Sequence, residues 1–303
     1  METKIDSNRA IVVPKMSMYE LDMHRFRLGH QELMQKYARD GFDIDRIIGS
    51  HERQQEAKMA SGKMFGEENF IHYDRLTQDL LAQASAVVAL GGDNHFQYVS
   101  HFVQDTLVIG VNSDPLTSEG ALTSFTTSTL EEFLPQLEKG AFSVEEWTRL
   151  ECKLNGKELP LAICDYFLGE KERSYMSRHL LKLGEKEEDQ KCSGLLVATG
   201  AGSSGWYDSA CRYLHPEGNP FAKNEKSARF LVTEPYHGKL NGYSMLEGKV
   251  GEGETLQVIS ANDACGVVTV DSIESYEFSR GMKAEIGISH IPLRVVIPDE
   301  GNK

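Results

Sequence analysis

Two short runs of apolar residues, at 86–90 and 106–112, constrain the fold of this chain more than any other feature. Neither run alternates with polar residues, and such runs are typical of strands that are buried on both faces of a sheet. Helix-forming stretches separate them from their neighbours, as in a parallel sheet covered by helices on both sides. The first half is therefore predicted to be an α/β domain with a parallel sheet, including a strand at 9–13 and helices at 17–38, 74–83 and 130–138.

The second half has many short strand candidates and little helix. Residues 150–154 alternate, and they are followed by Asn155-Gly156, a pair that favours a type I′ turn between antiparallel strands. Residues 203–214 are predicted to be helical, and 184–190 to be a solvated loop. This pattern predicts a mainly antiparallel β domain, with further strands at 161–168, 194–199, 228–233, 255–260, 266–270, 283–288 and 293–297.

The length of 303 residues agrees with two domains. We place the α/β domain at 1–135 and the β domain at 136–289. The C-terminal tail, residues 290–303, is expected to pack back on the α/β domain.

Composition excludes several classes of protein. The net charge is −14 and Lys and Arg form no cluster, so nucleic acid is not an expected partner. The longest apolar runs are too short to span a membrane, and the N-terminus lacks the features of a targeting signal, so we expect a cytoplasmic protein without a membrane partner. The five cysteines are odd in number and form no Cys-x-x-Cys pair, which argues against a disulfide framework or a zinc site.

The apolar run at 86–90 ends in Gly91, Gly92 and Asp93. In an open parallel sheet, ligands bind beyond the carboxyl ends of the strands. Two glycines there allow a phosphate to approach the backbone closely, and an aspartate can bind Mg²⁺ or take a proton from a hydroxyl group. The alternative is a tight turn in which the aspartate only caps the following helix.

A second loop of the same kind follows residues 194–199. It contains Gly200, Gly202, Ser203, Ser204 and Gly205, whose amides and hydroxyls are suited to binding a nucleotide at the start of a helix. Another carboxylate, that of Asp271, stands at the end of a predicted strand. The alternatives are an ordinary strand-to-helix turn and an Asx turn.

The motifs around these positions resemble those of the NAD kinase family. GGDNH, starting at Gly91, resembles GGDGT, and TGAGSSGWYDSA, starting at Thr199, resembles TGSTAYSLSA. The mitochondrial-type branch is especially similar, with GVNTDPERSEG against GVNSDPLTSEG from Gly110, NEVFIGE against CDYFLGE from Cys164, and WDACMVVDGG against NDACGVVTVDS from Asn262. The matching motifs occur in the same order and extend over nearly the whole chain.

The resemblance implies an enzyme that transfers the γ-phosphoryl group of ATP, with Mg²⁺, to the 2′-hydroxyl group of the adenosine ribose of NAD or NADH. It also implies a homodimer or homotetramer. Asp93 would be the catalytic residue, and no residue is assigned as a metal ligand. The residues that would bind the nucleotides are Gly91, Gly92, Asn94, His95, Asn112, Cys164, Asp165, Ser193, Thr199, Gly202, Ser203, Ser204, Trp206, Ser209 and Asp271.

Some residues depart from the family motifs. Asn94 and His95 replace Gly-Thr, and His95 either binds a phosphate oxygen or caps the following helix. Cys164-Asp165 replaces Asn-Glu, which should weaken or rearrange the contact to base or ribose, because a thiol is a weak hydrogen-bond partner. Trp206 either stacks on a base or packs in the core.

These departures keep other functions open. One is a catalytically weak or silent nucleotide-binding regulatory protein, and another is a kinase of a lipid or a sugar. The sequence does not decide between NAD and NADH as acceptor, or between ATP and polyphosphate as donor.

Overall fold

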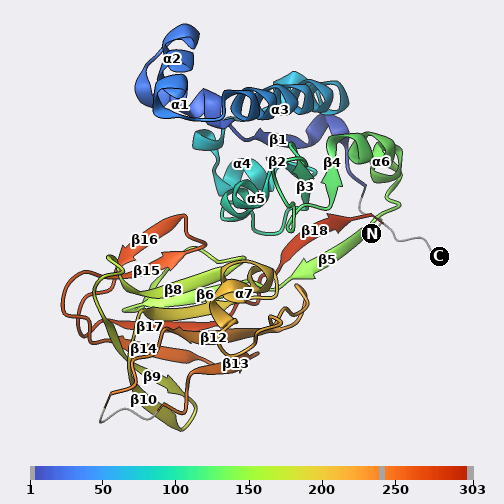
Figure 1. The fold of residues 1–303 in the computed structure, drawn as a ribbon. Helices are drawn as coiled ribbons and strands as arrows, with labels where there is room; N and C mark the ends of the chain where they lie inside the picture. Colours follow the sequence, from blue (N-terminus) through green and yellow to red (C-terminus); the bar gives the residue numbers. More distant parts are fainter. Residues whose placement is uncertain (1–3, 239–242, 299–303) are drawn as a thin grey trace. The chain divides into compact units, whose positions relative to one another are not determined.

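The computed structural model describes residues 4–238 and 243–298, and it divides the chain into two compact units (Figure 1). The first runs to Glu145 and includes the chain from Arg294 onward, and the second is Glu146–Leu293. The domain limits of 1–135 and 136–289 remain a prediction.

The first unit contains a sheet of order β1-β2-β3-β18-β5, with β4 also paired to β3. The pairs β1–β2, β2–β3 and β3–β18 are parallel, which confirms the predicted parallel sheet. Strand β18 comes from the end of the chain and pairs with β3 through Val295 and Val108. The strands are β1 Ile11–Pro14, β2 Val87–Gly91, β3 Val108–Asn112, β4 Phe125–Thr126, β5 Ser143–Trp147 and β18 Leu293–Ile297.

Strands β2 and β3 are buried along their whole length, as their unbroken apolar sequences predict. Val88 and Leu90 of β2 share a core cluster with Phe65 and Leu130, which lie on two of the covering helices. Helix α5 also packs against β2 and β3. The helices of this unit are α1 Met18–Phe26, α2 His30–Asp40, α3 Ile44–Phe65, α4 Gln78–Ala82, α5 Asp93–Ser100 and α6 Thr127–Lys139.

Two helix predictions need correction. The helix predicted at 17–38 is two helices, because Arg27 adopts a left-handed conformation (φ 53°) and ends α1. The helix predicted at 74–83 is reduced to α4, five residues capped by Thr77. The 22-residue helix α3 was not predicted, because its buried residues are Gln54, Ala57, Ser61 and Phe65, which give little apolar periodicity.

The second unit consists of two antiparallel six-stranded sheets, as expected for a mainly antiparallel domain. Residues of both sheets, such as Val258 and Val197, belong to one core cluster. The first sheet has the order β10 (Lys186–Cys192), β9 (Ser177–Leu183), β14 (Leu256–Ser260), β17 (Lys283–Ile288), β6 (Leu150–Leu154), β7 (Lys157–Glu158). The second has the order β13 (Glu247–Gly251), β12 (Ser227–Thr233), β11 (Gly194–Ala198), β8 (Asp165–Glu170), β15 (Gly266–Val270), β16 (Glu274–Glu277).

The Asn155-Gly156 turn is confirmed, with φ 48° and 81° at its two residues. The loop prediction for 184–190 was wrong. Most of these residues belong to β10, where Gln190 and Cys192 are buried while charged side chains occupy the other positions. The helix predicted at 203–214 is limited to α7, Trp206–Cys211, which packs against β12.

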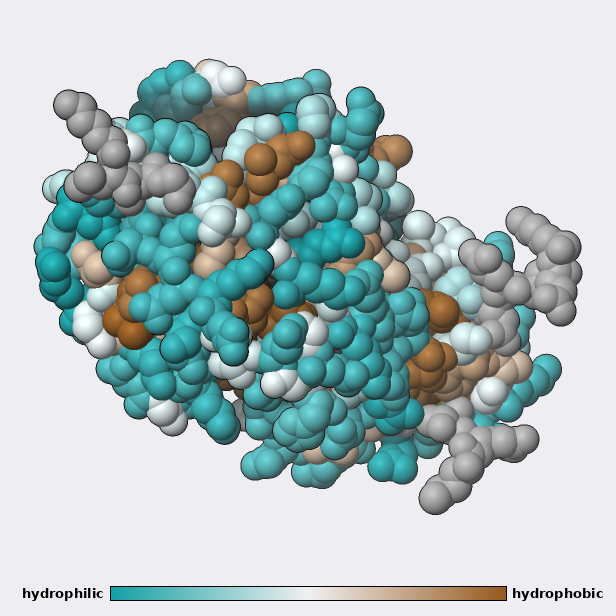
Figure 2. Space-filling view, turned by 90° about the horizontal axis from the view of Figure 1, so that it is seen from below, coloured by the Kyte–Doolittle hydropathy of each residue, from teal (hydrophilic) through white to brown (hydrophobic). Residues whose placement is uncertain are grey.

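The surface is dominated by hydrophilic residues, with smaller apolar patches among them, on the face that Figure 2 shows. This agrees with a chain that has 46 acidic and 32 basic residues. In the part of the chain that the structure describes, no helix combines the length and the apolar character needed to cross a bilayer.

Candidate functional site

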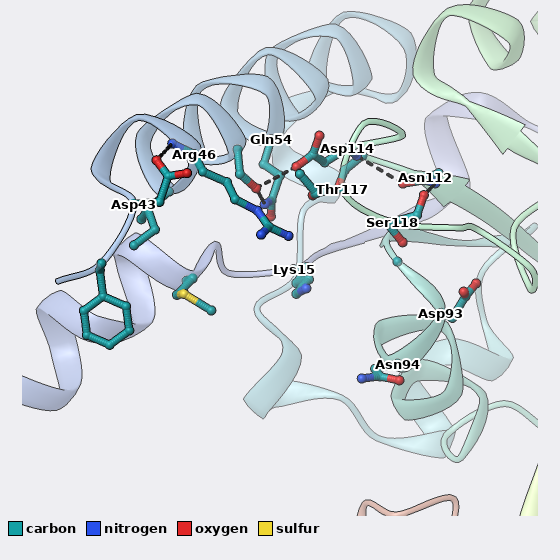
Figure 3. A pocket seen from close by; sticks show the side chains of 16 residues that line it. Lys15, Asp43, Arg46, Gln54, Asp93, Asn94, Asn112, Asp114, Thr117 and Ser118 are labelled. Carbon is teal, nitrogen blue, oxygen red and sulfur yellow. Dashed lines mark hydrogen bonds between the residues drawn. The ribbon is translucent and has the colours of Figure 1, made fainter. Parts of the chain in front are cut away.

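A cavity of about 650 Å³ lies within the first unit, where β1, β2 and β3 end (Figure 3). Lys15 follows β1, Gly92 and Asp93 follow β2, and Ser113 follows β3, and all four line the cavity. Because parallel strands present their carboxyl ends at one edge, three separate segments of the chain meet here. Helix α3 supplies another part of the wall.

Asp93 begins α5 and is partly exposed at this cavity. Its carboxylate accepts hydrogen bonds from the backbone N–H groups of Ala121 (3.1 Å) and Leu122 (2.8 Å). These bonds fix its orientation and leave lone pairs for a further partner. Gly92 is in close contact with the next loop, since a Cβ at this position would lie 2.6 Å from Oγ of Ser118. The loop therefore brings backbone and carboxylate together at the cavity wall.

Of the two residues that replace Gly-Thr, only Asn94 lines the cavity. The side chain of His95 is buried, and its Nε2 donates a hydrogen bond to the carbonyl of Val13 at 2.8 Å. Burial lowers the pKa of His95 to about 4, so the ring is neutral at pH 7. The expected phosphate contact of His95 does not fit this geometry, because the ring connects α5 to β1 instead.

The loop after β3 is held by polar contacts that sequence reasoning missed. Asn112 donates to the carbonyl of Ser118 (3.1 Å) and accepts from the N–H of Asp114 (3.1 Å). Burial alone would raise the pKa of Asp114, but hydrogen bonds from Arg53, Ser50 and Thr117 outweigh it and lower this pKa to about 2. The Arg53–Asp114 ion pair, with an N–O distance of 2.6 Å, connects this loop to α3. The GVNSDPLTSEG motif was the available signal for Asp114.

In the second unit, the buried hydroxyls of the loop after β11 are hydrogen-bonded to nearby backbone groups. Ser203 is 1% exposed, and its hydroxyl donates to the carbonyl of Gly200 (2.7 Å) and accepts from the N–H of Phe221 (3.0 Å). Thr199 is buried and donates to the carbonyl of Ile163. Gly202 packs against the backbone of Cys164, which leaves no room for a Cβ. These residues therefore hold the loop in place.

The remaining residues predicted on this loop lie nearer the surface. Ser204 and Ser209 are exposed. The ring of Trp206 is half-buried and lies 5.0 Å from the ring of Phe167, within a small apolar cluster. This is the packing arrangement that was one of the two alternatives for Trp206. Ser193 is half-buried and donates its backbone N–H to the carbonyl of Thr233 (2.9 Å).

Asp271 organises the backbone beside this loop. Its carboxylate accepts the N–H groups of Ile163 (2.9 Å), Cys164 (2.8 Å) and Asp165 (2.9 Å). The carboxyl group of Asp165 is buried as well, and burial together with the charge of Asp271 raises its pKa to about 8. The structure therefore gathers Cys164, Asp165 and Asp271 around one strand end.

Comparison with known proteins finds relatives named NAD kinase and NADH kinase. No protein-family model matches the chain. A "Probable NADH kinase" of Oryza sativa subsp. japonica is 28% identical over 236 residues, which are 70% of this chain and 71% of that protein. The "NAD kinase 2, mitochondrial" of Homo sapiens is 26% identical over 251 residues, 66% of this chain and 57% of that protein. The chain is similar to members of the NAD kinase family. It spans less than two thirds of the human relative's length.

Two solved NAD kinase structures share the fold. An NAD kinase from Archaeoglobus fulgidus in complex with ATP aligns with a TM-score of 0.64 at 18% identity, covering 96% of this chain and 94% of that one. Yeast NADH kinase complexed with NADH aligns with a TM-score of 0.63 at 15% identity, covering 77% and 68%. This chain therefore shares its fold with these two enzymes.

Proposed function

We propose that this chain is an NAD kinase, which transfers the γ-phosphoryl group of ATP to the 2′-hydroxyl group of the adenosine ribose of NAD or NADH. The observation that carries the proposal is the placement of Asp93, a carboxylate fixed by two backbone amides at the wall of a cavity. Sequence relatives named NAD kinase and NADH kinase support the same reaction.

In this reaction, Asp93 accepts the proton of the ribose hydroxyl group as that oxygen bonds to the γ-phosphorus, and the bond from the γ-phosphorus to the bridging oxygen breaks, so that ADP leaves. The Ala121 and Leu122 amides keep the carboxylate oriented, so little rearrangement is needed when the substrate arrives. Gly92 provides backbone that the phosphates can approach, whereas Gly91 is buried at the end of β2, beside His95, and is not part of the cavity wall. No group of three or more His, Cys, Asp or Glu among the described residues is arranged to hold a metal ion. We propose that Mg²⁺ arrives on the phosphates of ATP, because Mg²⁺ usually keeps several waters and is bound by substrate phosphates and one or two carboxylates.

We propose that the second unit binds the dinucleotide. The exposed hydroxyls of Ser204 and Ser209 are suited to direct contacts, whereas Ser203 and Thr199 act by holding the loop. The proposed dinucleotide-binding region also includes Cys164, Asp165, Ser193, Gly202, Trp206 and Asp271.

The test is to incubate the purified protein with ATP, Mg²⁺ and either NAD or NADH and to follow the 2′-phosphorylated product. Loss of product in Asp93→Asn, with folding retained, would support the proposal. Tight binding of NAD without turnover in the unmodified protein would instead identify the regulatory alternative. A panel of lipid and sugar acceptors, coupled to ADP release, tests the remaining alternative.

We further propose, on the family resemblance, a homodimer or homotetramer. Separately from that resemblance, we propose that the protein works in the cytoplasm. Light scattering of the purified protein would measure its molar mass in solution against the 33.9 kDa of one chain. Cell fractionation would test the compartment.

A further inference from the structure

The cavity of the first unit has two cationic side chains that the proposed chemistry does not yet use. Lys15 and Arg46 both belong to its wall, Lys15 after β1 and Arg46 on α3 (Figure 3). Within residues 4–238 and 243–298, neither side chain has a recorded ion pair or side-chain hydrogen bond with an acidic residue. Arg53, two turns further along α3, differs because it is paired with Asp114.

The carboxylates of the same wall are already engaged. Asp114 is bound by Arg53, Ser50 and Thr117. Asp43 caps α3 by accepting the N–H of Arg46 at 3.0 Å. Asp93 accepts two backbone amides. The ammonium of Lys15 and the guanidinium of Arg46 are therefore the charged donors left to meet a ligand, and a ligand that meets both is anionic.

The wall also has an apolar part. It is formed by Met18, Phe42 and Ile47, and two of these are unusually accessible for apolar residues, with Met18 60% and Phe42 55% exposed. The ring of Phe42 is supported by Tyr37, whose ring centroid lies 5.8 Å away in an edge-to-face arrangement. An accessible aromatic ring beside cationic side chains is a combination that binds a heterocyclic base and its phosphates.

We propose that this wall is the donor-specificity site, in which Lys15 and Arg46 hold the phosphates of a nucleoside triphosphate while Phe42, with Met18 and Ile47, contacts its base. This rests on the proposed kinase function and extends it, because it names residues that favour a nucleotide donor over polyphosphate. The volume of about 650 Å³ is in the range of cavities that take a ligand of this size. A phosphate chain without a base would leave the apolar part uncovered.

The experiment compares Lys15→Met, Arg46→Gln and Phe42→Ala with two controls outside the cavity wall. Arg25→Gln removes an arginine that is 73% exposed on α1, and Phe26→Ala removes a 40% exposed aromatic ring. The KM for ATP is measured at saturating NAD, and the KM for NAD at saturating ATP. Inorganic triphosphate serves as a second donor.

Losing a charge-assisted hydrogen bond should raise the KM for ATP by about 10- to 150-fold in Lys15→Met and Arg46→Gln, with the KM for NAD little changed. Phe42→Ala should raise the KM for ATP by about 5- to 150-fold and leave that for triphosphate unchanged. Both controls should match the unmodified protein. Cation variants with an unchanged KM for ATP, or a Phe42→Ala variant that weakens both donors equally, would overturn the assignment.

Calorimetric titration of each variant with Mg²⁺ and ATP, without acceptor, separates this proposal from the proposed function. If the unmodified protein binds ATP but phosphorylates neither NAD nor NADH, the proposed NAD kinase activity is wrong. The proposed ATP site is then tested separately, because Lys15→Met and Arg46→Gln should still lose ATP binding. If those variants bind ATP as tightly as the unmodified protein, the site is wrong, whatever the enzyme phosphorylates.

Discussion

Each unit has a strand that leads into a glycine-containing loop and then a helix, but the two loops use their polar groups differently. In the first unit, Gly92 and Asp93 border an open cavity. In the second, the hydroxyls of Thr199 and Ser203 bond to the backbone around them. The same local pattern therefore has two outcomes. In the first unit the carboxylate of the loop lines a cavity, and in the second unit the hydroxyls of the loop hold the nearby backbone in place.

Asp93→Asn should produce the largest effect on the first loop. The amide retains an oxygen that can accept one backbone N–H but cannot act as a base, so kcat should fall by about 10²- to 10⁴-fold. The loss of one hydrogen bond should lower the free energy of unfolding by only about 1 kcal/mol. A product assay and a thermal melt measure the two effects, with Asp74→Asn, an exposed carboxylate outside the cavity, as control. Full activity in Asp93→Asn would contradict the assigned role.

The next comparison introduces a methyl group into each loop. A Cβ at Gly200 would collide with the backbone of Ala222, which cannot move without opening the loop. A Cβ at Gly92 would meet the hydroxyl of Ser118, which can rotate away. Gly200→Ala should therefore lose about 1–3 kcal/mol or more of unfolding free energy, and Gly92→Ala much less. Gly92→Ala should mainly reduce kcat, because the methyl group occupies the cavity wall. Equal destabilisation in urea melts would contradict this difference.

Sequence reasoning located both loops because each is a local pattern of strand, glycine and polar residue. It did not reveal how the loops differ, since that depends on distant partners such as Phe221 for Ser203. It also missed the contact of α3 with the loop after β3, which Arg53 and Asp114 make across 61 residues of sequence. The burial of His95 was equally unpredictable, because its partner Val13 lies on another strand. The apolar strands β2 and β3 were predictable from unbroken apolar runs in the sequence, whereas partners that are distant in sequence were not.

A smaller effect should distinguish neighbouring serines of the second loop. Ser203→Ala removes a hydroxyl that both donates and accepts in a buried setting, at a cost of about 1–3 kcal/mol in unfolding free energy. Ser204→Ala changes an exposed side chain and should stay within about 0.5 kcal/mol of the unmodified protein. In the product assay, Ser204→Ala should raise the KM for NAD more than Ser203→Ala does. The opposite order of stabilities would mean that the second loop is not held as described.

The last comparison concerns pH and the strand end beside the second loop. Burial, and then the charge of Asp271, raises the pKa of Asp165 to about 8, far above its value in the unfolded chain. The folded state therefore keeps a proton that the unfolded state releases, so the contribution of Asp165 to stability is complete below about pH 4 and is lost as pH rises towards 8. Asp165→Asn, which cannot ionise, should show a flatter dependence of unfolding free energy on pH in this window. Urea melts at intervals between pH 5 and 8 would measure the slopes, and identical slopes would show that the folded protein does not keep the Asp165 proton in this window.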